Sequence, residues 1–388
     1  MTLTRILVAG LAASTCLTPA AWAQDDDTLT IGVLVTLSGP GAALGEMARN
    51  GFLLAAEEIG DFGGMKTELI VVDDEQKPDV AANKARELVE RNGADIVVGP
   101  IFSNIAGAIV QPVTQGGAIL ISPNAGPSNL AGAECNKAFF ATSYQNDQMH
   151  EVMGAHAQAQ GFQNVFLLAP NYQAGQDALA GFKHSYKGGV AGEIFTQLGQ
   201  LDYSAELAQI AAMQPDAVFA FMPGGMGVNL VRQYRQAGLE SIPFLSAFTV
   251  DESTLPAQAE AALGFFGGSN WAPDLDTAEN VAFVEAYEAK YGHVPAVYAM
   301  QAYDAARLID GALQQAGSTD RDALIAALED APFTSVRGDF SFGPNHFPIQ
   351  DFYLTEVVQR EDGKFATAVS EKIFDDYADN YAQNCQMN

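Results

Sequence analysis

In Leu29-Thr-Ile-Gly-Val-Leu-Val35 and the following Thr36-Leu-Ser-Gly-Pro-Gly-Ala-Ala-Leu-Gly45, the sequence indicates its fold class. The first part is an apolar run too short for a helix, and the second is a glycine-rich turn. A helical pattern then runs from Glu46 to Ile59. A strand, a tight turn and a helix in this order predict an α/β protein.

Residues 1–23 precede this stretch and have the pattern of a secretion signal. They carry one positive charge, at Arg5, an apolar run after it and an Ala21-Trp-Ala23 end that fits a small-x-small cleavage site. The mature chain is therefore expected to begin near Gln24 and to be exported. Cys16 could instead mark a lipid anchor, although the residues before it are a weak context for one.

Composition favours a two-domain protein with an acidic surface. Hydrophobic residues make up 48% of the chain, and about 365 residues remain after cleavage, enough for two domains with large cores. The 47 acidic and 19 basic residues give a net charge of −28, which becomes more negative when Arg5 leaves with the leader. Such a surface repels phosphate backbones and anionic lipid head groups, so we expect no nucleic-acid partner and no membrane-surface binding. Beyond the leader, no apolar stretch reaches the roughly 18 residues that a spanning helix needs.

Two cysteines remain once the leader is removed, Cys135 and Cys385. An oxidising compartment leaves them only each other as partners, so a disulfide is the leading interpretation. The alternative is a pair of free buried thiols. A disulfide would close a loop of about 250 residues and help to hold the C-terminal tail, by on the order of a few kcal/mol in the chain-entropy model.

Strand and helix signals alternate along the rest of the chain. Apolar strands separated by helices predict parallel sheets covered on both faces, so the expected architecture is α/β and doubly wound. Ligands of such sheets bind at the carboxyl ends of the strands. The expected strands are 68–74, 94–99, 118–122, 164–169 and 217–222, and the expected helices are 79–92, 105–114, 147–159, 175–186 and 228–237.

Three strands of the first half end in polar or glycine-rich turns that lead into helices. The turns are Ser38-Gly-Pro40, Gly99-Pro-Ile-Phe-Ser103 and Ser122-Pro-Asn-Ala-Gly126. Free backbone N–H groups and the positive dipole end at a helix N-terminus favour an anion, so three such termini facing one crevice would form a carboxylate site. Any single turn of this kind is an ordinary structural feature, and only the set of three favours binding.

These segments resemble the periplasmic solute-binding proteins of ABC importers, specifically the leucine/isoleucine/valine-binding type. The resemblance spans about residues 28 to 375. It is carried by Thr30-Ile-Gly-Val-Leu-Val-Thr-Leu-Ser-Gly-Pro40 with Gly45, Val97-Val-Gly-Pro-Ile-Phe-Ser103, Ile119-Leu-Ile-Ser-Pro123, Ala169-Pro-Asn-Tyr-Gln-Ala-Gly175, Tyr303-Asp-Ala-Ala-Arg-Leu308 and Val336-Arg-Gly-Asp-Phe-Ser-Phe342.

The resemblance implies the type I periplasmic binding protein fold, with two doubly wound α/β lobes, three crossing strands and a ligand between the lobes. Lobe one would take residues 28–143 and 272–345, and lobe two residues 144–271 and 346–388. The resemblance also implies a periplasmic protein that delivers a small solute to an inner-membrane ABC permease, and we expect a monomer without cofactor or metal. Closure of the lobes would exclude water and strengthen hydrogen bonds to the ligand.

Binding roles follow from the resemblance residue by residue. The family's carboxylate-holding serine falls on Ser103, and its contacts after the fourth strand fall on Asn124 and the two residues that follow it. Amino-acid binders commonly have a pocket tyrosine where this chain has Leu44, and another where it has Met226. The expected ligand-binding residues are Ser38, Leu44, Phe102, Ser103, Asn124, Ala125, Gly126, Tyr172, Met226 and Phe248.

The largest departure from the family concerns the ligand's ammonium group. Amino-acid-binding members usually carry an acid in the run that is Ser246-Ala-Phe-Thr249 here, and this chain has no acid until Asp251. A buried ammonium without a counter-charge is costly, so we expect a ligand with a carboxylate and no amine. The aromatic and thioether side chains favour a flat ring, as in a benzoate or hydroxycinnamate. The alternative is that Asp251 supplies the charge and the ligand is a hydrophobic amino acid.

Two other classes of function fit the sequence less well. Gly39, Gly41 and Gly45 miss the dinucleotide-binding spacing by one residue, no G-x-S-x-G motif occurs, and the histidines show no metal spacing. An exported α/β enzyme is therefore a distant alternative. A receptor ectodomain would need a spanning helix or a signalling domain, for which the sequence gives no signal.

Overall fold

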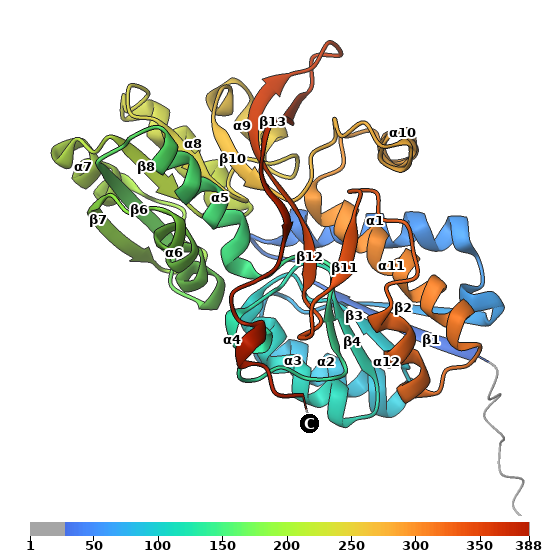
Figure 1. Cartoon of the computed structure of the whole chain (residues 1–388). Coiled ribbons are helices and arrows are strands. Elements are labelled where there is room, and N and C mark those ends of the chain that lie inside the picture. The colour runs from blue at the N-terminus through green and yellow to red at the C-terminus, as the bar shows by residue number, and fades with distance from the viewer. Residues whose placement is uncertain (1–27, 388) are drawn as a thin grey trace, which may run out of the picture.

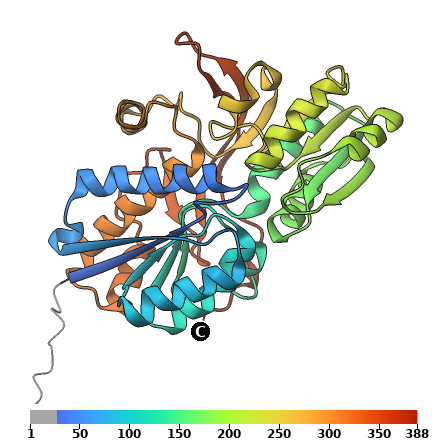
Figure 2. The same cartoon turned by 180° about the vertical axis from the view of Figure 1, so that it is seen from behind.

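The computed structural model describes residues 28–387, which fold into two α/β lobes lying side by side (Figure 1, Figure 2). The predicted signal segment and its cleavage site lie outside the described residues. One lobe is built on a five-stranded sheet and the other on an eight-stranded sheet. The two-lobe α/β architecture predicted from the sequence is confirmed.

The first lobe has a parallel sheet with helices on both faces. Its strands are β1 (Thr28–Val35), β2 (Lys66–Asp73), β3 (Ile96–Val98), β4 (Ile119–Ser122) and β5 (Phe139–Ala141), in the order β2-β1-β3-β4-β5. Each neighbouring pair is parallel, as the apolar character of the strands predicted. The helices are α1 (Ala42–Ile59), α2 (Pro78–Arg86, continued by a π-helical turn over Glu87–Arg91), α3 (Ser103–Gln115), α4 (Ser128–Ala131), α10 (Ala278–Tyr291), α11 (Val297–Ala316) and α12 (Arg321–Glu329).

The β1–turn–α1 unit depends on glycine for two close approaches. A Cβ atom on Gly45 would lie 1.8 Å from the carbonyl oxygen of Thr36, so a side chain there would push α1 away from the end of β1. A Cβ atom on Gly51 would lie 1.9 Å from the carbonyl oxygen of Ala299, where α1 packs on α11. The helix begins at Ala42, within the turn predicted from the sequence.

The second lobe continues the alternation. Five strands run parallel in the order β10-β9-β8-β6-β7, namely β6 (Asn164–Pro170), β7 (Gly189–Thr196), β8 (Ala217–Ala220), β9 (Phe244–Ser246) and β10 (Phe266–Ser269). Tyr203, Tyr234 and Phe244 anchor an apolar core of this lobe. The helices are α5 (Asn146–Ala159), α6 (Gln173–Ser185), α7 (Ser204–Met213), α8 (Gly225–Gln236) and α9 (Leu255–Gln258).

The C-terminal strands depart from the parallel pattern. β11 (Phe340–Phe342), β12 (Pro348–Gln359) and β13 (Phe365–Tyr377) follow one another without an intervening helix and pair antiparallel, and β12 also pairs antiparallel with β10. Gly363 (φ +84°) turns the chain between β12 and β13. Antiparallel strands can be joined by such a short turn, whereas parallel strands need a crossover helix. The doubly wound description therefore applies to β1–β10 only.

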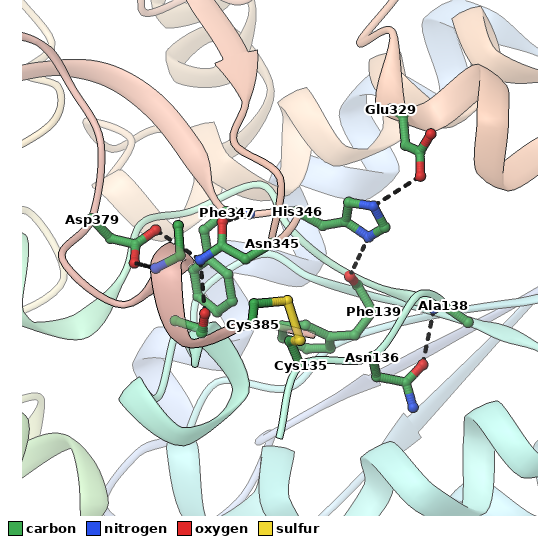
Figure 3. The surroundings of a disulfide bond; sticks show 12 residues. Cys135, Asn136, Ala138, Phe139, Glu329, Asn345, His346, Phe347, Asp379 and Cys385 are labelled. Atoms are coloured by element: carbon green, nitrogen blue, oxygen red, sulfur yellow. Dashed lines mark hydrogen bonds and ion pairs between the residues drawn. A yellow bond between two sulfur atoms is a disulfide. The ribbon is translucent and has the colours of Figure 1, made fainter. Parts of the chain in front are cut away.

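The chain end returns to the first lobe, where it is covalently fixed (Figure 3). Cys135 and Cys385 form a disulfide with Cα atoms 5.5 Å apart, so the predicted pairing is confirmed. Beside it, Asn345 donates to Asp379 at 2.9 Å, which ties the tail after β13 to the segment before β12. The tail thus lies against lobe one although the sequence assigned residues 346–388 to lobe two. The lobe limits 28–143 with 272–345 and 144–271 with 346–388 stay a prediction.

Candidate functional site

One cavity lies where the carboxyl ends of the strands of both sheets meet. Residues of lobe one, of lobe two and of the segment 142–145 contribute to it. This segment leads from β5 in the first lobe to α5 in the second, and we call it the first crossing. Its lining residues are Leu44, Ile101, Phe102, Ser103, Asn124, Ala125, Tyr144, Asn146, His150, Tyr172, Ala174, Phe221, Pro223, Phe248 and Tyr298.

The polar end of the cavity is at the N-terminus of α3. Ser103 is the first residue of this helix, and Phe102 before it provides no side-chain cap. The first backbone N–H groups of a helix have no partner within the helix, so they can bind an anion. Asn146 donates its amide to Ser103 Oγ at 3.1 Å, which leaves the hydroxyl proton of Ser103 available to a ligand.

Asp177 of α6 lies behind this polar end and is buried. Its carboxylate accepts from Asn146 at 2.8 Å, from Ser128 Oγ at 2.7 Å and from Gln173 at 2.8 Å. The side chain does not line the cavity. The backbone amide of Ser128 also donates to this carboxylate at 3.1 Å. Asp177 thus orients the amide of Asn146 toward Ser103, and four donors stabilise its charge.

A chain of hydrogen bonds fixes the turns after β3 and β4. Asn124 donates to the carbonyl oxygen of Ile101 at 2.6 Å and accepts from the hydroxyl of Tyr144 at 3.0 Å. Burial raises the pKa of Tyr144 well above its ordinary value, so the hydroxyl stays protonated. These bonds connect the turns after β3 and β4 to Tyr144 in the first crossing. They hold the polar end of the cavity in place.

The rest of the lining is aromatic or aliphatic and uncharged. Tyr172 stacks on Phe221 with ring centroids 6.3 Å apart, and Phe248 packs against Tyr144 at 5.1 Å and Tyr298 at 5.8 Å. Burial raises the pKa of Tyr172 and Tyr298 as well. Within residues 28–387, none of the side chains that line this cavity is Asp, Glu, Lys or Arg. Facing aromatic rings of this kind accommodate a flat apolar group.

His150 lies at the aromatic part of the cavity. Its ring meets Phe221 edge-on at 5.0 Å and Phe219 at 5.7 Å, and burial lowers the pKa of the imidazole to about 3. The ring is therefore neutral at physiological pH. Nδ1 has no hydrogen-bond partner among the described residues.

Asp251, the acid considered for an ammonium group, lies in a neighbouring cavity. That cavity is also lined by Glu252 and Trp271, and Phe248 borders both cavities. One carboxylate oxygen of Asp251 accepts from the Ser253 amide at 2.8 Å, and burial raises the pKa of the group. Phe248, with φ +58°, thus stands between the ligand cavity and the buried acid.

The structure brings most of the expected ligand-binding residues together. Leu44, Phe102, Ser103, Asn124, Ala125, Tyr172 and Phe248 line the cavity, and Ser38, Gly126 and Met226 do not.

Each of the three exceptions has a structural reason. Ser38 lies in the turn beside Asp73. A Cβ atom on Gly126 would lie 1.9 Å from the carbonyl oxygen of Tyr144, so this glycine permits a close backbone approach. The sulfur of Met226 accepts from the amide of Gly199 at 3.2 Å, because the start of α8 directs this side chain into the lobe-two core.

Sequence reasoning missed several lining residues. Tyr144 and Tyr298 reach the cavity, while Trp271 donates to Asn280 at 2.7 Å outside it. Asn146 and His150 are four residues apart on α5 and thus share a helix face. That spacing is visible in the sequence, but the direction of the face is not. The lining residues missed are Ile101, Tyr144, Asn146, His150, Ala174, Phe221, Pro223 and Tyr298.

Over residues 28–387, no helix has the length and apolar character needed to cross a bilayer. In the same part of the chain, no three His, Cys, Asp or Glu side chains gather as a metal site requires.

Known proteins resemble this chain over most of its length. A family model described as "Periplasmic binding protein" matches residues 28–364. The Leu/Ile/Val-binding protein homolog 6 of Brucella melitensis is 29% identical over 377 residues, which cover 94% of each chain.

Solved structures show a similar extent of likeness. A solute-binding protein of an ABC transporter from R. palustris, in complex with benzoate, is 32% identical with a TM-score of 0.87, covering 93% of this chain and 100% of that one. Another, from Rhodopseudomonas palustris BisB5 in complex with 3,4-dihydroxy benzoic acid, is 29% identical with a TM-score of 0.86, covering 91% and 99%.

Proposed function

Because the chain belongs to the periplasmic binding protein family, we propose that it captures an aromatic carboxylate between its lobes and delivers it to an ABC permease. It is an ABC-type solute-binding protein. The finer proposal concerns the ligand: a small acid with a flat ring and no amine, such as a benzoate or hydroxycinnamate. We further propose that the protein is an exported periplasmic monomer, and N-terminal mass spectrometry of secreted protein should give a mature chain starting near Gln24.

One observation carries the ligand proposal: the cavity has anion-binding groups at one end and no acid facing it. Ser103 and the start of α3 offer donors to a carboxylate. Asp251 lies behind Phe248 in a separate cavity. An amino acid bound here would bury its ammonium group against aromatic rings without a carboxylate partner, at a cost of several kcal/mol. The benzoates bound by the two similar proteins from Rhodopseudomonas support the same ligand class.

A hydrophobic amino acid is the second candidate. The relatives named Leu/Ile/Val-binding proteins favour it, and so does the buried carboxylate of Asp251 near the cavity. This alternative requires Phe248 to move so that Asp251 reaches the ligand.

A matched pair of ligands separates the two candidates. Phenylalanine and 3-phenylpropionate differ only in the α-ammonium group, so their affinities report directly whether the site accepts a positive charge. We expect benzoate, cinnamate and 3-phenylpropionate to raise the melting temperature, since a ligand at 100 times its Kd adds about 2.7 kcal/mol of stability. Leucine, valine and phenylalanine should shift it little. Stabilisation by leucine or phenylalanine without stabilisation by the acids would reject the proposal in favour of the second candidate.

The carboxylate end is tested by Ser103→Ala. Loss of a hydrogen bond to a charged group costs about 1.5–3 kcal/mol, so the dissociation constant measured by calorimetry should rise at least tenfold for every acid that binds. Ser204→Ala is the matched control, because Ser204 is also the first residue of a helix, α7, but is exposed and outside the cavity. Equal affinities of the two variants would show that Ser103 does not hold the carboxylate.

A further inference from the structure

His150 lines the cavity and carries a buried ring nitrogen that no residue in the described part of the chain hydrogen-bonds. The residue is 2% exposed, and Phe219, Phe221 and Phe248 surround its ring edge-on. Nδ1 has no partner among residues 28–387. A buried polar atom without a partner is costly and uncommon, and it calls for an explanation.

The protonation state determines what His150 can bind. Since the imidazole is neutral, it offers one N–H donor and one nitrogen acceptor rather than a positive charge. It therefore suits an uncharged polar group that can both donate and accept. A hydroxyl group meets this description, whereas a carboxylate, which only accepts, would favour a charged partner.

The position of His150 sets where on the ligand that hydroxyl must be. Asn146 and His150 lie on the same face of α5, four residues apart, and Asn146 donates to Ser103 at the carboxylate end. Four residues of helix advance about 6 Å. This is close to the span from the carboxyl group of a benzoate to a substituent on the opposite side of its ring. With the carboxylate at Ser103, the ring lies between the aromatic side chains and its para position comes to His150.

We propose that His150 is a specificity-determining residue that hydrogen-bonds a para-hydroxyl group, so that the ligands are phenolic acids of the 4-hydroxybenzoate type. This rests on the proposed function, because it presupposes an aromatic carboxylate held at Ser103. It goes beyond that function by assigning the opposite end of the ligand and the residue that recognises it.

The wild-type protein provides the first test. 4-Methylbenzoate replaces the hydroxyl of 4-hydroxybenzoate by a methyl group of similar size, so the pair isolates the hydrogen bond. We expect calorimetry to give a Kd for 4-hydroxybenzoate at least tenfold below those for 4-methylbenzoate and for 3-hydroxybenzoate. Equal affinity for the hydroxy and methyl compounds would overturn the assignment, whatever any variant does.

His150→Phe provides the second test, since it keeps an aromatic ring in the same surroundings and removes both nitrogens. The tenfold preference for 4-hydroxybenzoate over 4-methylbenzoate should disappear or reverse. His156→Phe is the matched control on the same helix; His156 packs against Phe266 outside the cavity, and the preference should remain.

The outcomes separate this proposal from the one on which it rests. If wild-type protein binds benzoates but the His150→Phe variant keeps the hydroxyl preference, aromatic acid binding stands and the role of His150 is rejected. If both compounds weaken equally in the variant, His150 only packs against the ring, which also rejects the role. If no benzoate binds the wild-type protein at a concentration of about 1 mM, where even weak binding is detected, both proposals fail together.

Discussion

Two groups of buried polar side chains lie between the lobes, and they differ in how fully their hydrogen bonds are formed. The first, which we call the crossing cluster, comprises Arg337, Asp304 and Gln350 with the backbone of Thr142 and Ser143. The second is the polar part of the ligand cavity, with Ser103, Asn146 and His150. Both are enclosed by apolar side chains from two lobes.

In the crossing cluster, the charged groups are satisfied within the chain. Arg337 donates to Asp304 at 3.1 Å, to Gln350 at 2.7 Å and to the carbonyl oxygen of Ser143 at 3.1 Å. The same guanidinium also donates to the carbonyl oxygen of Thr142. Asp304 further accepts from the amide of Val336 at 3.2 Å. The cluster thereby joins the first crossing to β12 through side chains of lobe one.

In the cavity, polar atoms are held in position by neighbouring side chains but keep hydrogen-bonding capacity that no described residue uses. Asn146 holds Ser103 Oγ from one side, and Nδ1 of His150 has no partner among the described residues. Burial is similar in both places, so burial alone does not distinguish structure from binding. The difference lies in the groups that carry the function: the charged groups of Arg337 and Asp304 are paired within the chain and stabilise the fold, whereas the open nitrogen of His150 leaves a bond for a ligand to supply.

The largest expected effect comes from breaking the crossing cluster. Arg337→Met should lower the free energy of unfolding by about 3–5 kcal/mol, because it leaves Asp304 as a buried charge without a partner. Urea denaturation followed by circular dichroism measures the loss. Arg86→Met is the control, since Arg86 is exposed on α2 and donates to Asn83 on the same helix; it should change stability by less than about 0.5 kcal/mol. A loss of the same small size in both variants would contradict the structural role of the cluster.

A second buried acid, Glu252, contrasts with Asp304 of the crossing cluster. Glu252 accepts from the amide and hydroxyl of Thr367, both at 2.7 Å, but unlike Asp304 it forms no ion pair with a described residue. Burial raises its pKa from 4.5 to about 7. Between these values the folded chain keeps a proton that the unfolded chain releases. The free energy of unfolding therefore falls as pH rises through this window, by on the order of 3 kcal/mol.

Glu252→Gln should remove this part of the pH dependence. The variant carries no titrating group at this position, so it should gain stability over the wild type at pH 8 and differ little from it near pH 4.5. Urea denaturation at a series of pH values checks this, with the exposed Glu260→Gln as control. A pH profile of Glu252→Gln that parallels the wild type would show that Glu252 is ionised in the folded protein at neutral pH.

The sequence predicted the parts of this fold that depend on local pattern. The run from Leu29 to Val35, the glycine turn and the following helix form β1 and α1 as expected, and the cysteine count led to the Cys135–Cys385 disulfide. The antiparallel strands β11 to β13 were not foreseen, because their signals are short and their pairing depends on where β12 lies relative to β10.

The site was predictable only where a strand end dictates the position. Asn124 and Phe248 lie two residues after β4 and β9, Ser103 begins the helix after β3, and all three line the cavity. Met226 also follows a strand, yet the first turn of α8 directs its side chain away. His150 lies in the second turn of α5, where only the packing of that helix against both lobes decides which way the imidazole faces. No spacing in the sequence carries that information.

The smallest change in stability is expected at His150, whose Nδ1 has no partner among the described residues. His150 and His346 are both buried histidines in contact with aromatic rings, but His346 uses both ring nitrogens, with Nδ1 3.2 Å from the carbonyl oxygen of Phe139 and Nε2 3.1 Å from Glu329 (Figure 3). Without ligand, His150→Phe should change the free energy of unfolding by less than about 0.5 kcal/mol or raise it, because no bond to a described residue is lost at Nδ1 and an aromatic ring remains in the same aromatic surroundings. His346→Phe should cost about 1–3 kcal/mol, since it leaves the carbonyl oxygen of Phe139 buried without its partner. Urea denaturation of both variants measures the difference. A loss at His150 as large as that at His346 would mean that the imidazole already has a structural partner, and the cavity would then be a finished part of the fold rather than an open site.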